Sequence, residues 1–480
     1  LIKKELSEKL VDSRFAVTSL LCIVVMPLGM YVSCQDYERR LVDYRDASQT
    51  YRERFKDEMG PFVEVQGFRP PSALSVFALG IDAFIPSGIV TSRSGRFHTV
   101  KEPVTSSPGS LLFGRTDYLF YVTFVLSLAA LTMTFDSIAG EKEAGTLKLM
   151  ISHAVSRRSI VLSKIIGNYV SILLPFVVSL MVALLFLELS SVISLGSSSL
   201  WISLLALIAV TMLYLFVMTC LGVWVSTQRH HSINALILAF FVWTLLTLAI
   251  PKISPMIARV LYPIESPDAI NSAKRMVIED LENELEQERG RLLGRCHDES
   301  GTPRSDRNRL PALSEAGKKA LAKYGKEATL LEQAFQRRIT DSIQKIERDY
   351  QRERNRQFNM AINISRISPV SCFVYVVSRI AGTGVAEPLN FVRNAARFQA
   401  EVNAAIYEQY DMKSYPGGSW TGDAKSGFDP ARAKTPVMTY RYATLAEALG
   451  NSWVDILLLG CGGILFYGTA YRGLHNYDVR

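Results

Sequence analysis

The sequence lacks the residue spacings that metal sites and hydrolase sites need. Its 480 residues include six cysteines and six histidines, and no two cysteines have the CxxC spacing of a zinc or redox motif. His230 and His231 are adjacent, so they cannot face one ion from a helix, and no serine stands in a nucleophile elbow. We predict no catalytic residue, no metal site and no cofactor in this chain. A disulfide between Cys296 and Cys372 is possible, but no spacing in the sequence supports it.

A nucleotide-binding loop is also lacking. Gly140 and Gly145 have the GxxxxG spacing of a phosphate loop, but Thr146 and Leu147 follow where Lys and Ser or Thr are required. The stretch follows an apolar run instead of a β-strand, and no LSGGQ-like signature occurs elsewhere. The chain is therefore predicted not to be an enzyme, and ATP and Mg would be bound by a separate ATPase.

The positive charge of the chain does not indicate nucleic acid. The formal net charge is +8, but Lys and Arg lie mainly in loops that flank apolar runs and along helices rich in Glu. We predict membrane lipid, and no nucleic acid, as a partner.

Apolar residues, in contrast, are abundant and gathered in long runs. The chain is 49% hydrophobic, with a mean hydropathy of +0.16. The first run is too long for a secretory signal and has no small-residue cleavage site, so we interpret it as a membrane anchor. The runs near the ~20 residues that cross a bilayer are 15–32, 118–135, 165–187, 200–225, 233–250 and 454–470.

Positive charges predict the orientation of these runs, because Lys and Arg in short loops stay in the cytoplasm. The loop 188–199 contains no Lys or Arg. The predicted inside segments carry Lys3, Lys4, Lys9, Lys142, Lys148, Arg157, Arg158, Arg229, Arg472 and Arg480. Six spans with both termini cytoplasmic satisfy this asymmetry.

This orientation predicts five regions and an all-α membrane protein with a mainly helical extracytoplasmic domain. Inside that domain, apolar residues recur at helical spacing over 268–293 and over 320–350, which predicts a long helical hairpin. The regions are 1–34 with an amphipathic segment and the first span, 35–117 outside, 118–250 with spans two to five and a cytoplasmic loop at 139–160, 251–452 as the large extracytoplasmic domain, and 453–480 with the sixth span and the cytoplasmic C-terminus.

The stretch 364–380 is apolar but short. Pro369 interrupts it, and Arg366 and Arg379 lie near its ends. We predict an interfacial helix on the outer leaflet. The alternative is a seventh span, which would place the C-terminus outside.

The most informative sequence is FDSIAGEKEAGTLKLMISHAVSRRSIVLSKIIGNYV at 135–170. A helix is expected to leave the membrane at Asp136, pass through a charged run, turn at Gly145 and restart before the third span. A charged and ordered cytoplasmic loop of this kind is suited to docking another protein. Asp136 and Lys164 are predicted to be structural charges at the inner mouth of the spans.

This sequence resembles the cytoplasmic coupling region of type-2 ABC exporter permeases, with a pattern near E-x-E-x-G-T-L, then a Pro-Val-Ser-Arg-like turn, then Gly-Lys or Ser-Lys. Ala154 stands where that family has Pro. Residues 69–75 with Gly80, 367–369, 381–384 and 477–480 resemble the subfamily with a large extracytoplasmic insertion before the last span. The matching coupling positions are Glu141, Glu143, Gly145, Thr146, Leu147, Val155, Ser156, Arg157 and Lys164.

The resemblance implies a permease in the bacterial plasma membrane that pairs with a second permease copy and binds ABC ATPase subunits. Glu141 and Glu143 would contact the ATPase, Gly145 would allow the turn, and Arg157 and Arg158 would lie near lipid headgroups. The residues implied in ATPase coupling are Glu141, Glu143, Gly145, Thr146, Leu147, Ser156, Arg157 and Arg158.

We therefore predict the permease of an ATP-driven exporter. Two alternatives remain: a mechanotransducer that acts on an extracytoplasmic partner protein without moving cargo, and a passive membrane scaffold. No motif identifies a substrate.

Overall fold

The computed structural model describes residues 2–57, 64–91, 97–100, 117–152, 156–190, 198–300, 315–409 and 437–477. The chain divides into two compact units. The first comprises Leu1–Pro251 and Arg366–Arg480, and the second comprises Lys252–Ser365. The sequence places the end of the large domain at residue 452, whereas residues from Arg366 onward belong to the first unit.

Within these described ranges, six helical segments are long and apolar enough to cross a membrane. Each predicted apolar run lies in one of them, so the all-α membrane fold with six candidate spans is confirmed. The segments are α2 (Ser13–Asp57); Tyr118–Glu143 with α4 (Tyr118–Phe120), the π-helix η3 (Tyr121–Leu126), α5 (Ser127–Thr134) and α6 (Ala139–Glu143); α8 (Arg157–Leu189); α9 (Ser198–Gln228); Ser232–Leu261 with α10 (Ser232–Thr244), the π-helix η4 (Leu245–Ala249) and α11 (Ile250–Leu261); and α16 (Leu445–His475).

Helix α9 forms the centre of the first unit and packs against α5, α8, α10, α14 and α16. Its most apolar 18 residues are 61% buried, against 22% for α16. Helix α14 (Pro369–Ile380) also lies inside the unit, where Phe373 stacks on Tyr214 of α9 with ring centroids 4.5 Å apart. The predicted interfacial helix is wrong here, because the apolar face of α14 is covered by protein.

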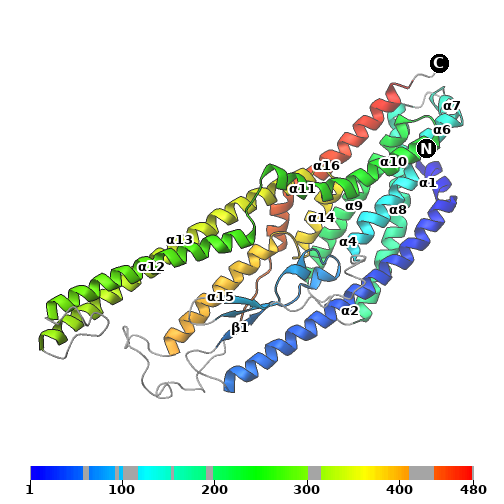
Figure 1. Cartoon of the computed structure of the whole chain (residues 1–480). Helices are drawn as coiled ribbons and strands as arrows, with labels where there is room; N and C mark the ends of the chain where they lie inside the picture. Colours follow the sequence, from blue (N-terminus) through cyan, green and yellow to red (C-terminus); the bar gives the residue numbers. More distant parts are fainter. Residues whose placement is uncertain are drawn as a thin grey trace. The chain divides into compact units, whose positions relative to one another are not determined.

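The N-terminal helix α1 (Ile2–Val11) packs along α8. Both termini lie at the end of the first unit that carries α6 and α7 (Thr146–Ser152) (Figure 1). Helix α2 continues well beyond its apolar run. At ~1.5 Å per residue, its 45 residues measure about 65 Å, so the segment after the first span begins as helix.

A small sheet, which the sequence did not predict, follows α2. Its strands β1 (Val65–Phe68), β2 (Gly88–Thr91) and β3 (Phe97–Val100) pair antiparallel in that order. Val65 lies opposite Thr91, and Val90 lies opposite His98. Helix α15 (Glu387–Gln409) packs against this sheet through Phe398, whose ring lies close to Gly67.

Two short motifs that resemble the family meet in space, although about 300 residues separate them. Ser72, before the 3₁₀ turn η1 (Ala73–Val76), donates to the Ala381 carbonyl at 2.6 Å. The Thr383 hydroxyl donates to the Ala78 carbonyl at 2.7 Å. Gly80 has a φ of +51°, and its backbone lies so close to Thr383 that a side chain would clash. The second 3₁₀ turn, η2 (Asp82–Phe84), follows.

The second unit contains the predicted hairpin. Helices α12 (Pro267–Ser300) and α13 (Glu315–Ser365) pack along each other (Figure 1). The two helices are antiparallel. Residues further along α12 form ion pairs with residues nearer the start of α13, as in Lys274–Glu347, Glu284–Arg338 and Glu299–Lys323. All six cysteines are free thiols in this structure.

Candidate functional site

The predicted coupling residues lie at the end of the first unit that carries both termini. The charged segment, residues 139–160, forms α6, a turn at Gly145, and α7, and Ser156 then caps α8 by accepting from the Ser159 amide at 3.2 Å. Residues 153–155, which include Ala154 and Val155, lie outside the described residues. Gly145 has a φ of +74°, and no atom lies within 4 Å of an added Cβ. Glycine is therefore required here for backbone conformation and not for space.

Leu147 anchors α7 to the bundle. Its side chain is fully buried, while its neighbours Thr146 and Lys148 are exposed. A fully buried Leu contributes about 1.5–3 kcal/mol relative to an exposed one. It packs in a cluster with Ile138, Ile160, Val161, Ile165, Cys220, Val223, Ala470 and Leu474. Helix α7 is thereby fixed to α8, α9 and α16 through apolar contacts.

Lys164 of α8 lies between two carboxylates. Its Nζ is 2.7 Å from Oε1 of Glu5, on α1, and also contacts Oε1 of Glu141, on α6. The side chains of Lys164 and Glu5 are 6% and 7% exposed. Because buried charges are stable only when they are paired, Lys164 joins α1 and α6 to α8.

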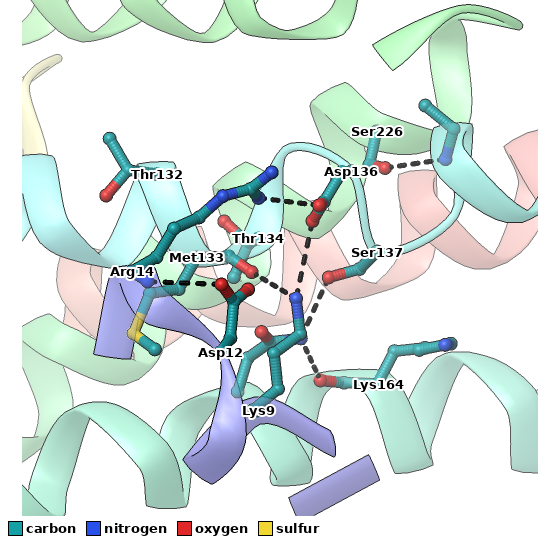
Figure 2. A network of polar contacts seen from close by, with 12 residues as sticks. Lys9, Asp12, Arg14, Thr132, Met133, Thr134, Asp136, Ser137, Lys164 and Ser226 are labelled. Carbon is teal, nitrogen blue, oxygen red and sulfur yellow. Dashed lines mark hydrogen bonds and ion pairs between the residues drawn. The ribbon is translucent and has the colours of Figure 1, made fainter. Parts of the chain in front are cut away.

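Asp136 lies at the centre of a second charged group (Figure 2). Its Oδ2 is 2.6 Å from Nη1 of Arg14, and its Oδ1 is 3.3 Å from Nζ of Lys9. Lys9 also donates to the Met133 carbonyl at 2.9 Å. This carbonyl is near the end of α5, where backbone acceptors lack helical partners. The N-terminal residues therefore hold the end of the second span.

The charged segment, with Ile138 just before it, also contacts the last turn of α9. Ser226 accepts hydrogen bonds from the Ile138 and Ala139 amides, both at 2.9 Å. Lys142 donates to the Thr227 carbonyl at 2.5 Å. Helix C-termini favour such cations, so Lys142 stabilises the end of α9.

Glu143 accepts from the Ser232 amide at 2.9 Å, and its Oε1 is 3.6 Å from Nδ1 of His231. Ser232 is the first residue of α10, and helix N-termini favour carboxylates. Arg157 makes the opposite contact at the end of α16, where it donates to the Leu474 carbonyl at 2.9 Å and to the His475 carbonyl. Arg158 is exposed.

The surface that the segment presents outward is mixed in character. Ala144, Gly145, Thr146, Lys148 and Leu149 are exposed. The Leu149 side chain is 63% exposed, although it is a large apolar residue on a seven-residue helix.

The comparison with protein families decides the class of the chain. A family model described as ABC-2 family transporter protein matches residues 1–407. The chain belongs to this family. It is thus a membrane permease component of an ABC transporter, and the family implies an ABC ATPase as partner. A search of curated proteins found no match.

The site of this ABC-2 permease contains the predicted residues in different surroundings. Glu141 and Glu143 bind within the chain, to Lys164 and to the start of α10, and Arg157 binds the end of α16. Asp136 and Lys164 both bind α1, through Lys9 and Glu5, and their place at the inner mouth of the spans stays a prediction.

Sequence reasoning missed three contributions to the site: the N-terminal residues, Ser226 and the exposed Leu149 of α7. Lys9 was used for orientation alone, and Glu5 was not considered. Both lie one helical turn apart and therefore share a face of α1. That spacing, next to a predicted amphipathic segment, was the available signal.

Proposed function

We propose that this chain is the membrane-spanning permease subunit of an ATP-driven exporter whose ATPase is a separate polypeptide. ATP and Mg would be bound by the ATPase, and both permease termini would face the cytoplasm of a bacterial plasma membrane. The observation that carries this proposal is the charged segment. It is fastened to α8, α9, α10 and α16, and through Lys164 also to α1, and its outer side exposes Lys148 and Leu149.

The ties of the charged segment determine how a docked ATPase would act. Leu149 and Lys148 form the contact, whereas Glu141, Glu143 and Arg157 transmit the displacement, because their partners lie on the spans. ATP binding must then favour one packing of the spans over another, since a ligand with equal affinity for both packings shifts neither. Direct contact of Glu141 and Glu143 with the ATPase stays a prediction, and the 45% exposure of Glu143 leaves its side chain accessible.

A second permease copy is part of the proposal. The most apolar parts of Ser232–Leu261 and of α16 are each 22% buried. Large apolar faces are thus left for lipid or for another permease, and pairing of two permeases would give each ATPase of a dimer its own charged segment.

The test is co-purification with the ABC ATPase encoded beside this chain. Leu149→Glu should remove the ATPase from the complex, because it places a carboxylate in the contact. Leu330→Glu is the matched control, since Leu330 is a 65% exposed leucine on α13. If both variants keep the ATPase, or if the wild-type chain does not bind it, the docking assignment is refuted and a passive scaffold is left.

The helical hairpin favours a second candidate function. Helix α13 has 51 residues and, at ~1.5 Å per residue, measures about 75 Å. A mechanotransducer would use such a hairpin to move an extracytoplasmic partner protein without exporting cargo. Transport into sealed inverted vesicles distinguishes the two: ATP-dependent solute movement supports the exporter, and ATP hydrolysis without it supports the mechanotransducer.

A further inference from the structure

A pocket of about 720 Å³ opens at the other end of α16, away from the charged segment. Helix α15 forms one wall, and residues 441–451 form another. Four arginines line it together with two glutamates, which gives a net charge of +2. The lining arginines are Arg379, Arg393, Arg397 and Arg441.

Within the described part of the chain, three of these arginines form no ion pair, although Arg441 interacts electrostatically with Glu447 over a longer distance. Arg379 binds Asp455 at 3.0 Å, but no carboxylate among the described residues forms an ion pair with Arg393, Arg397 or Arg441. Arg393 and Arg397 are also one helical turn apart, an arrangement in which like charges repel. An anion in the pocket would relieve this repulsion.

The two lining carboxylates are already engaged. Glu387 is buried and accepts a hydrogen bond from Tyr440 at 2.6 Å. Burial raises the pKa of Glu387 above its ordinary value, against the opposing effect of hydrogen bonds from Tyr440 and Asn390. Glu447 caps α16 through the Thr444 amide at 2.8 Å. Glu387 is therefore committed to Tyr440 and Asn390, and Glu447 offsets part of the charge of Arg441 alone.

The backbone around Arg441 is fixed before any ligand binds. Asn390 and Asn394 donate to its carbonyl at 3.1 and 3.3 Å, and its amide donates to Asn394 at 3.3 Å. Tyr442 donates to the Pro70 carbonyl at 2.6 Å. Such preorganisation lowers the entropic cost of binding.

The sequence of α16 places the pocket at the depth of lipid headgroups. Asn451 lines the pocket, Trp453 follows with 62% exposure, and the apolar run starts at residue 454. Exposed tryptophans concentrate at the membrane–water boundary. Leu389, which is 56% exposed, adds an apolar side chain to the lining.

We propose that this pocket binds the phosphate of an anionic lipid headgroup. Arg397 and Arg441 contribute charge-assisted hydrogen bonds to the phosphate, Arg393 adds positive potential, and Leu389 contacts the first carbons of the lipid. Guanidinium groups suit this role because they match phosphate oxygens in pairs. The inference depends on α16 crossing the membrane and is independent of ATP coupling.

The experiment is native mass spectrometry of the purified full chain in a neutral detergent. The chain is titrated with phosphatidylglycerol, with phosphatidylcholine and with inorganic phosphate. The pocket variant carries Arg397→Gln and Arg441→Gln. The control carries Arg337→Gln and Arg356→Gln, which remove the same charge from exposed positions on α13.

Saturable binding of phosphatidylglycerol, weakened about tenfold or more in the pocket variant and unchanged in the control, is the expected result. Equal binding of phosphatidylcholine, or equal loss in the control, would overturn the proposal. Inorganic phosphate that binds as tightly and needs the same arginines would overturn the lipid source and assign a soluble phosphate ester. If the pocket variant does not fold, Arg397→Gln alone on the exposed helix face gives the same comparison.

Discussion

Lys164→Met removes the cation that α1 and α6 share at the charged segment. The ammonium group of Lys164 is 2.7 Å from Glu5 and also contacts Glu141, and the three side chains are 6%, 7% and 20% exposed. Methionine keeps most of the side-chain volume, so packing changes little. The substitution therefore leaves two carboxylates buried beside each other without a counter-charge.

Removing one partner of a buried ion pair costs about 3–5 kcal/mol. For large domains each kcal/mol shifts the melting midpoint by about 2 °C, so Lys164→Met should lower it by about 6–10 °C. The measurement is thermal unfolding in detergent at one scan rate, followed by intrinsic fluorescence. Lys4→Met is the control, because Lys4 is 70% exposed and its pair with Glu8 contributes about 0.5 kcal/mol or less.

A third variant separates charge from packing. Lys164→Met combined with Glu5→Gln and Glu141→Gln removes all three charges, and it should recover most of the lost stability, since neutral replacement of a buried charge group is often tolerated. Two results would contradict this reasoning: a melting midpoint of Lys164→Met equal to that of the Lys4→Met control, or a midpoint of the triple variant no higher than that of Lys164→Met. In either case the pairing of Lys164 with Glu5 and Glu141 does not hold the segment as described.

Single contacts give three more expectations. Gly145→Ala should lower stability by about 1–2 kcal/mol in thermal melts, because alanine is strained at a φ of +74°, whereas Gly450→Ala, within a helix, should not. Glu387→Gln should raise the melting midpoint at neutral pH. The pKa of Glu387 is raised in the folded state, so the protonated form stabilises the fold and is lost as pH rises through the folded-state pKa. Glutamine stays neutral, and the gain in melting midpoint should therefore shrink toward pH 4. Arg338→Ala should cost less than about 1 kcal/mol by circular dichroism, since its pair with Glu284 is half exposed.

Length and periodicity were sufficient to predict the spans and the hairpin. A run of about 20 apolar residues has few structures open to it, because unpaired backbone groups are costly in lipid. A stripe with steps of three or four residues likewise specifies one helical face. Both signals are local, so neither depends on knowing the rest of the fold.

Helix α14 and the sheet depend on distant residues and could not be predicted in the same way. Arg366 and Arg379 looked like the ends of an interfacial helix, but both bind Asp455 on α16, at 2.7 and 3.0 Å. Those pairs allow the arginines to accompany a buried helix. Strand β1 likewise packs against Phe398, which lies more than 300 residues further along the chain.

The same reason explains the candidate site. Glu141 and Lys164 were recognised from the sequence, but Glu5, the third member of their group, lies in a helix that looked like a membrane-surface segment. Charge alone could not show whether Glu141 and Glu143 face a partner or their own chain. In the structure Glu141 is mostly covered beside Lys164, whereas Glu143 is 45% exposed and accepts from the Ser232 amide.

The arrangement of these contacts constrains the mechanism that a docked ATPase could use. A force on the exposed side of α7 reaches α8 through Leu147 and Lys164, and it reaches the end of α16 through Arg157. Packed interiors have low compressibility and transmit such a displacement without absorbing it. The charged segment should therefore move the inner ends of several spans together, as one body. Removing one of these contacts, as in Lys164→Met, should accordingly weaken the link between ATP hydrolysis and permease motion while the ATPase stays bound. Co-purification would measure the binding, and ATPase rates on the same sample would measure the link.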